Sequence, residues 1–396
     1  MTNGYDIIII GGRCAGSSAA IGLARAGYRV LLLERQEMPS DTISTHVLWP
    51  DGVAALERLG VLDRVLGSGA PKAHHFRLVR GEDEIVAPIV PFQGIDYLLC
   101  VRRLYLDGIL WDAAKATPGV DAFDRTSAIS LRRDESGERV IGLELKGPEV
   151  GHRYALAELV VGADGRGSFV AREVGAAEHD ITPPGRYWYY GYFSGVDLPE
   201  PISMTESDTE TDMVGSMPTN DGLQMVVYGA YDDDFAEFRR NHRQGYLDRV
   251  RAHPWFERVL HNATLETQVY GFSGVRGYYR TAHGPGWALI GDAAHQKDPL
   301  VARGVNEALR EAEWLSESLA GGISVDGLAR YERLLREHTW GRTLNSRVLM
   351  RPDRYMTPEQ GERLAMATST PEGLAEYLRV EYDDAMGFER FFSVAR

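Results

Sequence analysis

Cysteine is almost absent from this chain. Only Cys14 and Cys100 occur among 396 residues, and neither lies in a CxxC motif or beside histidines at the spacing of a zinc site. The sequence therefore predicts neither a disulfide framework nor a metal site. Two isolated cysteines fit a reducing compartment, and we expect the protein to be cytoplasmic.

Long apolar runs and an excess of positive charge are also missing. The Ile7–Ile10 run has the length of a strand, far below the roughly 20 residues that cross a bilayer. Lysine and arginine total 43 against 57 aspartate and glutamate residues, which gives a formal charge of −14. We therefore expect neither a membrane nor a nucleic acid as a partner.

The chain does contain enough apolar sequence for a large core. Hydrophobic residues make up 44% of it, and its length exceeds the roughly 250–300 residues over which one core keeps growing. Two lobes are therefore expected. Helical spacing is found over Pro50–Leu66 and Leu104–Lys115, and from residue 306 onward the chain is mostly helical.

A βαβ pattern opens the chain. Residues Tyr5–Ile10 and Arg29–Glu34 have the composition of buried parallel strands, and Ser17–Ala26 between them is helical. The intervening turn reads GGRCAG, close to the GxGxxG fingerprint whose glycines make a tight turn and admit a pyrophosphate, while an acidic residue such as Glu34 binds ribose hydroxyls. A purely structural glycine turn is the alternative. The nucleotide interpretation makes candidate ligands of Gly11, Arg13, Cys14, Ala15, Gly16, Glu34 and Arg35.

A second candidate segment is Val160–Ser168, with the sequence VVGADGRGS. It places Asp164 and Gly165 directly after a short apolar strand. Such a pair could be an ordinary tight turn, or Asp164 could contribute to the same cofactor site.

The third segment, Gly286–Leu309, carries the strongest signal. A strand at Trp287–Ile290 leads into Gly291-Asp292, a loop and then a helix. A carboxylate at a strand end can hydrogen-bond a polyol, and free N–H groups at a helix start stabilise an anion. A flavin has both features, because its ribityl chain carries hydroxyls and its pyrimidine edge becomes anionic on reduction. The candidate ligands here are Gly291, Asp292, Pro299, Gly304, Val305 and Asn306.

Together and in this order, the three segments resemble the single-component FAD-dependent monooxygenases of the p-hydroxybenzoate hydroxylase type. Their wider superfamily also holds geranylgeranyl reductases and flavin-dependent halogenases. The resemblance covers roughly residues 5–66, 98–175 and 283–320. It implies noncovalent FAD with NADPH or NADH as reductant, and no second GxGxxG is found, as that family leads one to expect. It also makes Arg103 a pyrophosphate ligand at the start of a helix, although Arg102 competes for that role and a surface arginine is the alternative.

The fold class that the resemblance implies is α/β, a Rossmann-like FAD-binding lobe with an inserted β-rich lobe. We expect a discontinuous FAD-binding domain of residues 1–71, 98–178 and 283–325. Residues 72–97 and 179–282 should form the β-rich substrate lobe, in which Thr219–Gly222 is a hairpin turn. Residues 326–396 should form a helical C-terminal segment.

The chain departs from the family pattern at three places. Arg13 occupies the second glycine position of the fingerprint, so its side chain must turn away from the phosphate or take part in binding it. Ala302 stands where the family often has glycine. The charged pair Lys297-Asp298 precedes Pro299, and the two side chains could pair with each other on the surface or tune flavin and substrate.

In the chemistry that the resemblance implies, reduced flavin reacts with oxygen to give a C4a-hydroperoxide that oxygenates a small aromatic or polycyclic substrate. The protein must exclude water and position the substrate. His46 and Lys297 are candidates for chemistry, and a hydrogen-bonded structural histidine is the alternative for His46. Tyr189 is a candidate within the aromatic strand Arg186–Phe193, where Tyr187, Gly191 and Phe193 should share its face. The acidic stretches Ser207–Asp212 and Asp232–Asp234 are interpreted as solvated loops.

Two other functions remain open. A flavin-dependent reductase of isoprenoid-type double bonds would use the same motifs, and a non-catalytic FAD-binding redox protein would bind the cofactor without turnover. A halogenase is less favoured because the WxWxIP motif is absent from the sequence. The substrate, the choice between NADPH and NADH, and the oligomeric state cannot be read from these patterns.

Overall fold

A mainly parallel sheet forms the core of one half of the molecule. The computed structural model describes residues 4–209 and 211–383. Its first strand, β1 (Tyr5–Ile10), pairs in parallel with β2 (Val30–Leu33) and β11 (Gly151–Gly162). The isoleucines of β1 are buried, as expected for a parallel strand covered by helices. The sheet continues through β8 (Val120–Phe123), β20 (His283–Gly284) and β21 (Trp287–Leu289), with β9 (Ser127–Arg133) and β10 (Val140–Gly147) attached in antiparallel fashion.

Helices pack along this sheet, and two of them differ from prediction. α1 (Cys14–Arg25) begins earlier than expected, because the Ser17 amide already donates to the Arg13 carbonyl at 2.9 Å. The helix predicted over residues 50–66 is divided in two at Gly60, whose φ of +75° a continuous helix cannot contain. The helices here are α2 (Pro50–Arg58), α3 (Leu62–Gly67), α4 (Arg103–Ala116), α5 (Phe169–Val174) and α9 (Gly304–Ser318).

A second sheet, mainly antiparallel, forms the β-rich half. Because β5 pairs with β14, residues 75–88 share this sheet with strands that follow residue 186. The predicted hairpin turn is confirmed, since Asp221 and Gly222 both have the positive φ of a type I′ turn. In sheet order the strands are β17 (Thr264–Leu265), β13 (Arg186–Ser194), β16 (Gln224–Tyr231), β15 (Asp212–Pro218), β14 (Ser203–Asp208), β5 (His75–Arg80) and β6 (Asp83–Pro88), with β18 (Tyr270–Phe272) beside β13.

The two faces of the second sheet have different neighbours. Tyr187 and Tyr189 pack with Phe238 on a face covered by α6 (Phe235–Phe238), α7 (His242–Arg251) and α8 (Pro254–Val259). Tyr190 and Tyr192 belong to a separate core on the other face. Two small sheets complete the strands, one of β3 (Val47–Leu48), β4 (Lys72–Ala73) and β7 (Leu98–Cys100), the other of β12 (Glu178–Thr182), β19 (Gly277–Arg280) and β22 (His295–Gln296).

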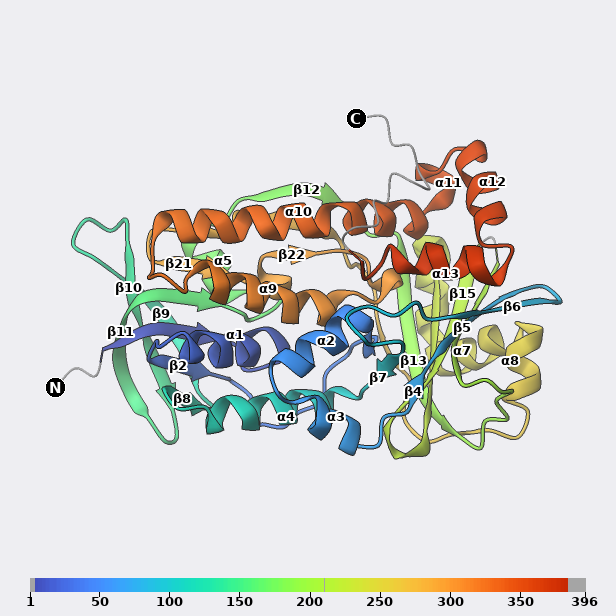
Figure 1. The fold of residues 1–396 in the computed structure, drawn as a ribbon, viewed down its shortest axis with the longest axis horizontal. Helices are drawn as coiled ribbons and strands as arrows, with labels where there is room; N and C mark the ends of the chain where they lie inside the picture. The colour runs from blue at the N-terminus through green and yellow to red at the C-terminus, as the bar shows by residue number, and fades with distance from the viewer. Residues whose placement is uncertain (1–3, 210, 384–396) are drawn as a thin grey trace.

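The C-terminal segment consists of one long helix and three short ones. α10 (Val325–Met350) runs along the molecule beside α9, and α11 (Pro352–Tyr355), α12 (Pro358–Ala367) and α13 (Pro371–Arg379) gather over the end that holds the second sheet (Figure 1). Each short helix starts with proline, which fits the first helical position because its missing N–H has no partner there. The predicted helical segment extended to residue 396, and residues 384–396 lie outside the described part of the chain.

The predicted α/β fold class is confirmed, with a parallel sheet beside a β-rich sheet and a helical C-terminal segment. Within residues 4–209 and 211–383, no helix combines the length and the apolar composition that crossing a membrane requires.

Candidate active site

The glycine turn after β1 is held too tightly for larger residues. Gly11 has φ +105°, and a Cβ there would lie 2.3 Å from the carbonyl oxygen of Ala163. A Cβ on Gly16 would lie 1.8 Å from the carbonyl oxygen of Gly11. The turn therefore requires glycine at both positions, and it packs directly against the end of β11. In this way the fold brings the first two motifs together.

Arg13 turns away from the glycine turn and binds neighbouring segments. Its Nη1 donates to Asp107 Oδ2 at 2.7 Å and to the Ser40 carbonyl at 3.1 Å, and its Nη2 donates to Gln36 Oε1 at 2.7 Å. The guanidinium thus joins the loop after β2 to α4. Of the two possibilities that the sequence left open for Arg13, the structure shows the side chain turned away from the turn.

Asp107 is the shared partner of this region, and sequence reasoning missed it. Its carboxylate is fully buried and accepts hydrogen bonds from Arg13, from Arg103 (Nη2 to Oδ1, 2.9 Å) and from the Cys14 thiol (3.1 Å). Burial raises the pKa of the Cys14 thiol, so the thiol is a packed donor. The four-residue spacing of Arg103 and Asp107 within one helix was the available signal.

Glu34 is hydrogen-bonded to the backbone of the glycine turn. Its carboxylate accepts hydrogen bonds from the backbone amides of Gly12 and Gln36, both at 2.9 Å, and it is buried. The adjacent Arg35 is exposed. Glu34 therefore lies beside the turn, whereas the Arg35 side chain points to solvent.

Asp164 caps a helix. One carboxylate oxygen accepts from the Ser168 hydroxyl at 2.6 Å, and the other accepts from the amide of Phe169 at 2.7 Å, the first residue of α5. Burial raises the pKa of the carboxyl. The motif at residues 160–168 therefore builds a strand–turn–helix junction, and its turn lies against the glycine turn.

Asp292 and the start of α9 form an open part of the site. Within the described residues, no group donates a hydrogen bond to the Asp292 carboxylate, which is exposed and whose pKa is raised by desolvation from the surrounding protein. Gly304 also faces open space, because a Cβ there would meet no atom within 4 Å. Arg103, Arg166 and Lys297 lie near enough to Asp292 to oppose the rise in its pKa. Free amides at the first turn of a helix as long as α9 attract negative charge.

The side chain of Asn306 has a different role from its backbone. Its Oδ1 accepts from the Trp49 amide at 2.8 Å, and its Nδ2 donates to the Val47 carbonyl at 3.1 Å. It therefore locks α9 to the segment before α2. Gly291 at the other end of the motif has φ +63°, and its amide donates to Glu311 at 2.6 Å.

Lys297 and Asp298 are buried, so the interpretation of the two as a surface pair was wrong. Lys297 is 8% exposed and pairs with Glu307 on α9, while Asp298 is 4% exposed and accepts from the Leu300 amide at 3.0 Å. Burial lowers the pKa of Lys297 and raises that of Asp298 to about 6. Each side chain thus has its partner elsewhere, Glu307 on α9 for Lys297 and the Leu300 amide for Asp298. The sequence alone does not reveal these partners.

His46 is buried and hydrogen-bonded. Its Nε2 contacts the Tyr192 hydroxyl, its ring stacks on Tyr192 with centroids 5.9 Å apart, and its φ of +61° is unusual for a residue with a side chain. Burial, with help from Arg103 and Arg102, lowers the pKa of His46 to about 3, so the imidazole is neutral at physiological pH.

Tyr189 lies on the wrong face for the candidate pocket. Its ring packs against Phe238 at 5.0 Å and His242 at 5.7 Å, under the helices that cover the far side of the sheet. Because strand side chains alternate, Trp188 instead reaches the cavity. The aromatic strand therefore reaches the cavities through Arg186 and Trp188, and the structure does not bring Tyr189 to them.

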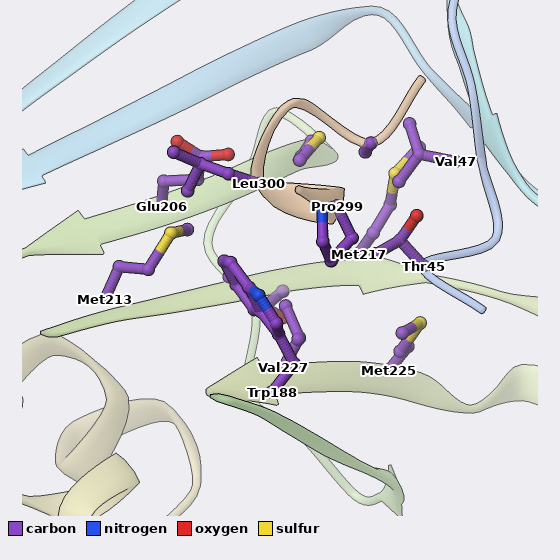
Figure 2. Close-up of a pocket in the computed structure, with 14 residues that line it drawn as sticks. Thr45, Val47, Trp188, Glu206, Met213, Met217, Met225, Val227, Pro299 and Leu300 are labelled. Carbon is purple, nitrogen blue, oxygen red and sulfur yellow. The ribbon is translucent and has the colours of Figure 1, made fainter. Parts of the chain in front are cut away.

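A cavity adjoins the loop that leads into α9. Its narrow part, about 30 Å³, lies between the sheet strands β14–β16, the Thr45–Val47 segment and the turn at Pro299–Ala302, as Figure 2 shows. A larger cavity of about 470 Å³ shares five lining residues with the narrow part and extends beneath the C-terminal helices. The shared residues are Met204, Glu206, Met213, Leu300 and Ala302.

The acidic stretch at residues 207–212 is not simply a solvated loop. Asp208 and Asp212 belong to β14 and β15 and line the larger cavity. Asp212 has protein partners in Tyr228 at 3.1 Å and His253 at 3.3 Å. The cavity also takes residues from α11–α13, which no sequence motif marked.

Comparison with known proteins places this geometry in a family. The sequence model of the family described as FAD binding domain matches residues 4–349. The chain therefore belongs to that family, within the superfamily of FAD-dependent monooxygenases and halogenases, and it is an FAD-dependent oxidoreductase.

Particular relatives span most of the chain. The squalene epoxidase erg1 of Schizosaccharomyces pombe is 27% identical over 361 residues, covering 85% of this chain and 73% of the relative. The 6-methylpretetramide 4-monooxygenase of Streptomyces rimosus is 26% identical, covering 96% of this chain and 92% of the relative. The structure of the flavin-dependent brominase Bmp2 matches with a TM-score of 0.81 at 19% identity, covering 96% of this chain and 94% of that one. At that identity the likeness shows the fold alone.

Proposed function

We propose that the protein is an NAD(P)H- and oxygen-dependent monooxygenase that oxygenates a small aromatic or polycyclic molecule. The observation that carries the proposal is the cavity of about 470 Å³ whose narrow end meets the turn at Pro299–Ala302, in the loop that leads to Gly304 and α9. A cavity of this size can hold a molecule of two or three rings. The oxygenases among its relatives support the same reaction type.

The residues of the cleft fit FAD. Gly11 and Gly16 let the turn after β1 pack tightly against neighbouring backbone, and Gly304 borders open space. Asp292 is a hydrogen-bond acceptor with no protein donor among the described residues, as a ribityl hydroxyl requires. Bound FAD supplies the reaction with NAD(P)H and oxygen. We assign its binding to Gly11, Arg13, Cys14, Ala15, Gly16, Glu34, Arg35, Arg103, Asp164, Gly291, Asp292, Pro299, Gly304, Val305 and Asn306.

Some of the assigned residues are free to contact FAD, and others hold the surrounding backbone in place. The Gly304 position and the Asp292 carboxylate are open to a ligand, and Arg103 lies near Asp292 with its charge partly directed to Asp107. The side chains of Arg13, Glu34, Asp164 and Asn306 are engaged by protein partners and hold the surrounding backbone in place. Arg35, which is exposed, has the weakest structural support in this set.

The walls of the cavity would exclude water and hold the substrate. Met204, Met213 and Leu300 give the narrow end an apolar, adaptable surface, because methionine side chains fit irregular shapes. His46, neutral and hydrogen-bonded to Tyr192, is a positioning residue that fixes the Thr45–Val47 segment lining this end. Lys297 acts through Glu307, which it holds beside the first turn of α9.

Stopped-flow spectroscopy of the FAD-loaded protein tests this function. The protein is mixed with NADPH or NADH, oxygen and a panel of phenols, aromatic acids and polyketides, and product is identified by mass spectrometry with ¹⁸O₂. We expect substrate-stimulated NAD(P)H oxidation and one ¹⁸O atom in the product. Purified protein without flavin absorbance would contradict the whole assignment. Turnover that continues without oxygen would identify a reductase of double bonds, and flavin without any turnover would identify a redox protein.

A further inference from the structure

The larger cavity contains a buried carboxylate with an unmet hydrogen-bonding atom. Glu381, which follows α13, is 4% exposed and lines the cavity. Its Oε1 accepts from Asn345 Nδ2, whereas its Oε2 has no hydrogen-bond partner among residues 4–209 and 211–383. A buried carboxylate oxygen without a donor is costly, so a partner from a ligand is the simplest way to satisfy it.

Two further carboxylates face the same space. Glu206 and Asp208 are two residues apart on β14 and therefore point to the same side of the sheet, and both line the cavity. No hydrogen bond or ion pair to either side chain occurs within the described residues. The charges of Glu381, Glu206 and Asp208 all raise the pKa of Tyr377 on α13, so the three carboxylates lie near the same side chain.

Cations lie near two of these carboxylates and are held by other groups as well. Arg80, Arg186 and His253 lie near Asp208, and Arg186 also donates to the Met350 carbonyl at 2.9 Å. Arg303, Arg342 and Lys297 lie near Glu381, but Arg303 pairs with Asp51 and Lys297 pairs with Glu307. Among the described residues, the charged neighbours that shift the pKa of Glu206 are the negative Asp208 and Glu381.

The remaining acidic residues of the cavity already have partners. Asp353 pairs with Arg351 at 2.8 Å, and Asp212 pairs with His253 at 3.3 Å. Among the described residues, the cavity carboxylates with at least one oxygen that accepts no hydrogen bond are therefore Glu206, Asp208 and Glu381, which we call the carboxylate cluster.

The rest of the cavity wall is largely apolar, and no metal fits the cluster. Among the described residues, no group of three or more His, Cys, Asp or Glu side chains lies close enough to hold a metal ion. The ligand must then combine an apolar body with donors at one end. The apolar part of the lining includes Trp49, Phe76, Leu78, Met204, Met356 and Leu374.

We propose, on the basis of the function proposed above, that the substrate is an aromatic or polycyclic amine whose protonated nitrogen binds the carboxylate cluster. An ammonium group supplies up to three donors and one positive charge, whereas a hydroxyl supplies one donor and leaves the charge unbalanced. Charge-assisted hydrogen bonds of this kind are stronger than neutral ones. The amine would anchor at Glu381 and β14 and leave the ring system directed toward the Pro299–Ala302 turn.

The protonation behaviour of the cluster supports this assignment. Desolvation and the charges of Asp208 and Glu381 raise the pKa of Glu206 to about 8, and desolvation raises the pKa values of Asp208 and Glu381 against the neighbouring cations. The free protein therefore retains a proton on Glu206 near neutral pH. A bound ammonium group would replace that proton as the source of positive charge.

Binding of three compounds of the same shape tests the inference. Calorimetry with the FAD-loaded protein at pH 8, without NAD(P)H, compares 1-naphthylmethylamine, 1-naphthalenemethanol and 1-naphthoate. We expect the amine to bind at least about tenfold more tightly than the alcohol, the size of one charge-assisted hydrogen bond, and the carboxylate to bind most weakly. Equal affinities, a preference for the carboxylate, or no binding of the amine at millimolar concentration would overturn the inference.

Variants locate the amine. Glu381→Gln and, separately, Glu206→Gln should weaken amine binding about tenfold and leave alcohol binding unchanged. Asp353→Asn is the matched control, because it removes a cavity carboxylate that Arg351 already neutralises, and it should bind the amine like the wild type. If the Glu381 variant does not fold, the Glu206 variant carries the test. Amine binding that ignores both substitutions would contradict the assignment.

This test is independent of turnover. An amine preference without oxygenation of any panel compound would remove the monooxygenase proposal and leave the binding site. Oxygenation of neutral substrates without any amine preference would retain the monooxygenase and remove the inference.

Discussion

The region around the cofactor-binding motifs and the cavity beside it differ in how their charged side chains are paired. Around the cleft, buried cations and anions are paired by the protein: Asp107 accepts from Arg13 and Arg103, and Asp51 binds Arg303 through two hydrogen bonds of 2.7 and 2.6 Å. In the cavity, Glu206 and one oxygen of Glu381 have no such partner within the described part of the chain. The protein itself thus pairs the buried charges around the cofactor-binding motifs. In the cavity, we expect a ligand to supply the missing partner.

Breaking the pairing in the cleft should have the largest effect. Asp107→Asn leaves Arg103 and Arg13 without their anion in a buried setting, and we expect a loss of about 3–5 kcal/mol in the free energy of unfolding. Urea denaturation followed by circular dichroism measures it.

The control lies on the same helix. Asp112→Asn removes a 66% exposed carboxylate that contacts Arg64 at 3.2 Å, and it should cost less than about 1 kcal/mol. Similar losses in both variants would show that burial of the Asp107 pairs has no special weight.

Asp292 is the exception on the cofactor side, because its carboxylate is open to a ligand. Asp292→Ala should weaken FAD binding by roughly 10- to 100-fold, the range for one hydrogen bond to a charged group. Titration of the apoprotein with FAD, followed by flavin fluorescence, gives the dissociation constant. Asp326→Ala, which removes an equal charge from the exposed first turn of α10, serves as control. Unchanged FAD affinity in the Asp292 variant would argue against the assigned role.

The raised pKa of Glu206 in the cavity should make the stability of the protein depend on pH. The pKa of Glu206 is raised from 4.5 to about 8, so the folded protein binds a proton that the unfolded chain has lost. The stability from this proton is complete below pH 4.5 and is lost as pH rises through about 8. Relative to wild type, Glu206→Gln should gain about 1–2 kcal/mol across that interval, a value reduced for solvent access to this half-buried group.

Thermal unfolding at a series of pH values measures the difference. The groups that face Glu206 are Asp208 and Glu381, which raise its pKa, and Tyr377, while Arg80 and Arg186 act on Asp208. Adding Glu381→Gln should therefore reduce the effect of Glu206→Gln. Parallel pH profiles for wild type and the Glu206 variant would contradict the prediction.

The smallest effect is expected at the seam between the two regions. Ala302 has φ +51° and ψ +38°, a left-handed conformation that disfavours residues with a Cβ. Ala302→Gly should raise the free energy of unfolding by up to about 1 kcal/mol. Ala329→Gly, inside helix α10, should lower it by about 1 kcal/mol. A loss of stability in the Ala302 variant would show that its methyl group packs favourably.

The cofactor cleft was far easier to predict than the cavity. Glycine turns, strand ends and helix starts are local in sequence, so short patterns could predict the turn at Gly11 and the strand–loop–helix segment that holds Asp292 and Gly304. Asp107 was missed because its importance depends on Arg13, which lies 94 residues away. The sequence left the partner of Lys297 open, because Glu307 lies ten positions away on α9.

The cavity depends on contacts that no short pattern records. Glu206, from β14, and Glu381, after α13, lie 175 positions apart, yet both line the cavity. Tyr189 was chosen from an aromatic strand whose alternation was predicted correctly. Helices α6–α8 pack over the face that carries Tyr189, so the opposite face of the sheet meets the cavity. The position of these helices is a property of the folded chain.

Helix α10 marks a natural joint for protein engineering. The match to the family ends at residue 349, and the cavity roof formed by Pro352, Met356, Leu374, Tyr377 and Glu381 lies beyond it. The part of the chain matched by the family model and the cavity roof, here called the cap, thus meet within one turn of the last residues of α10. Exchanging the cap at this joint, with the catalytic platform left intact, offers a route to redirect the enzyme to new compounds.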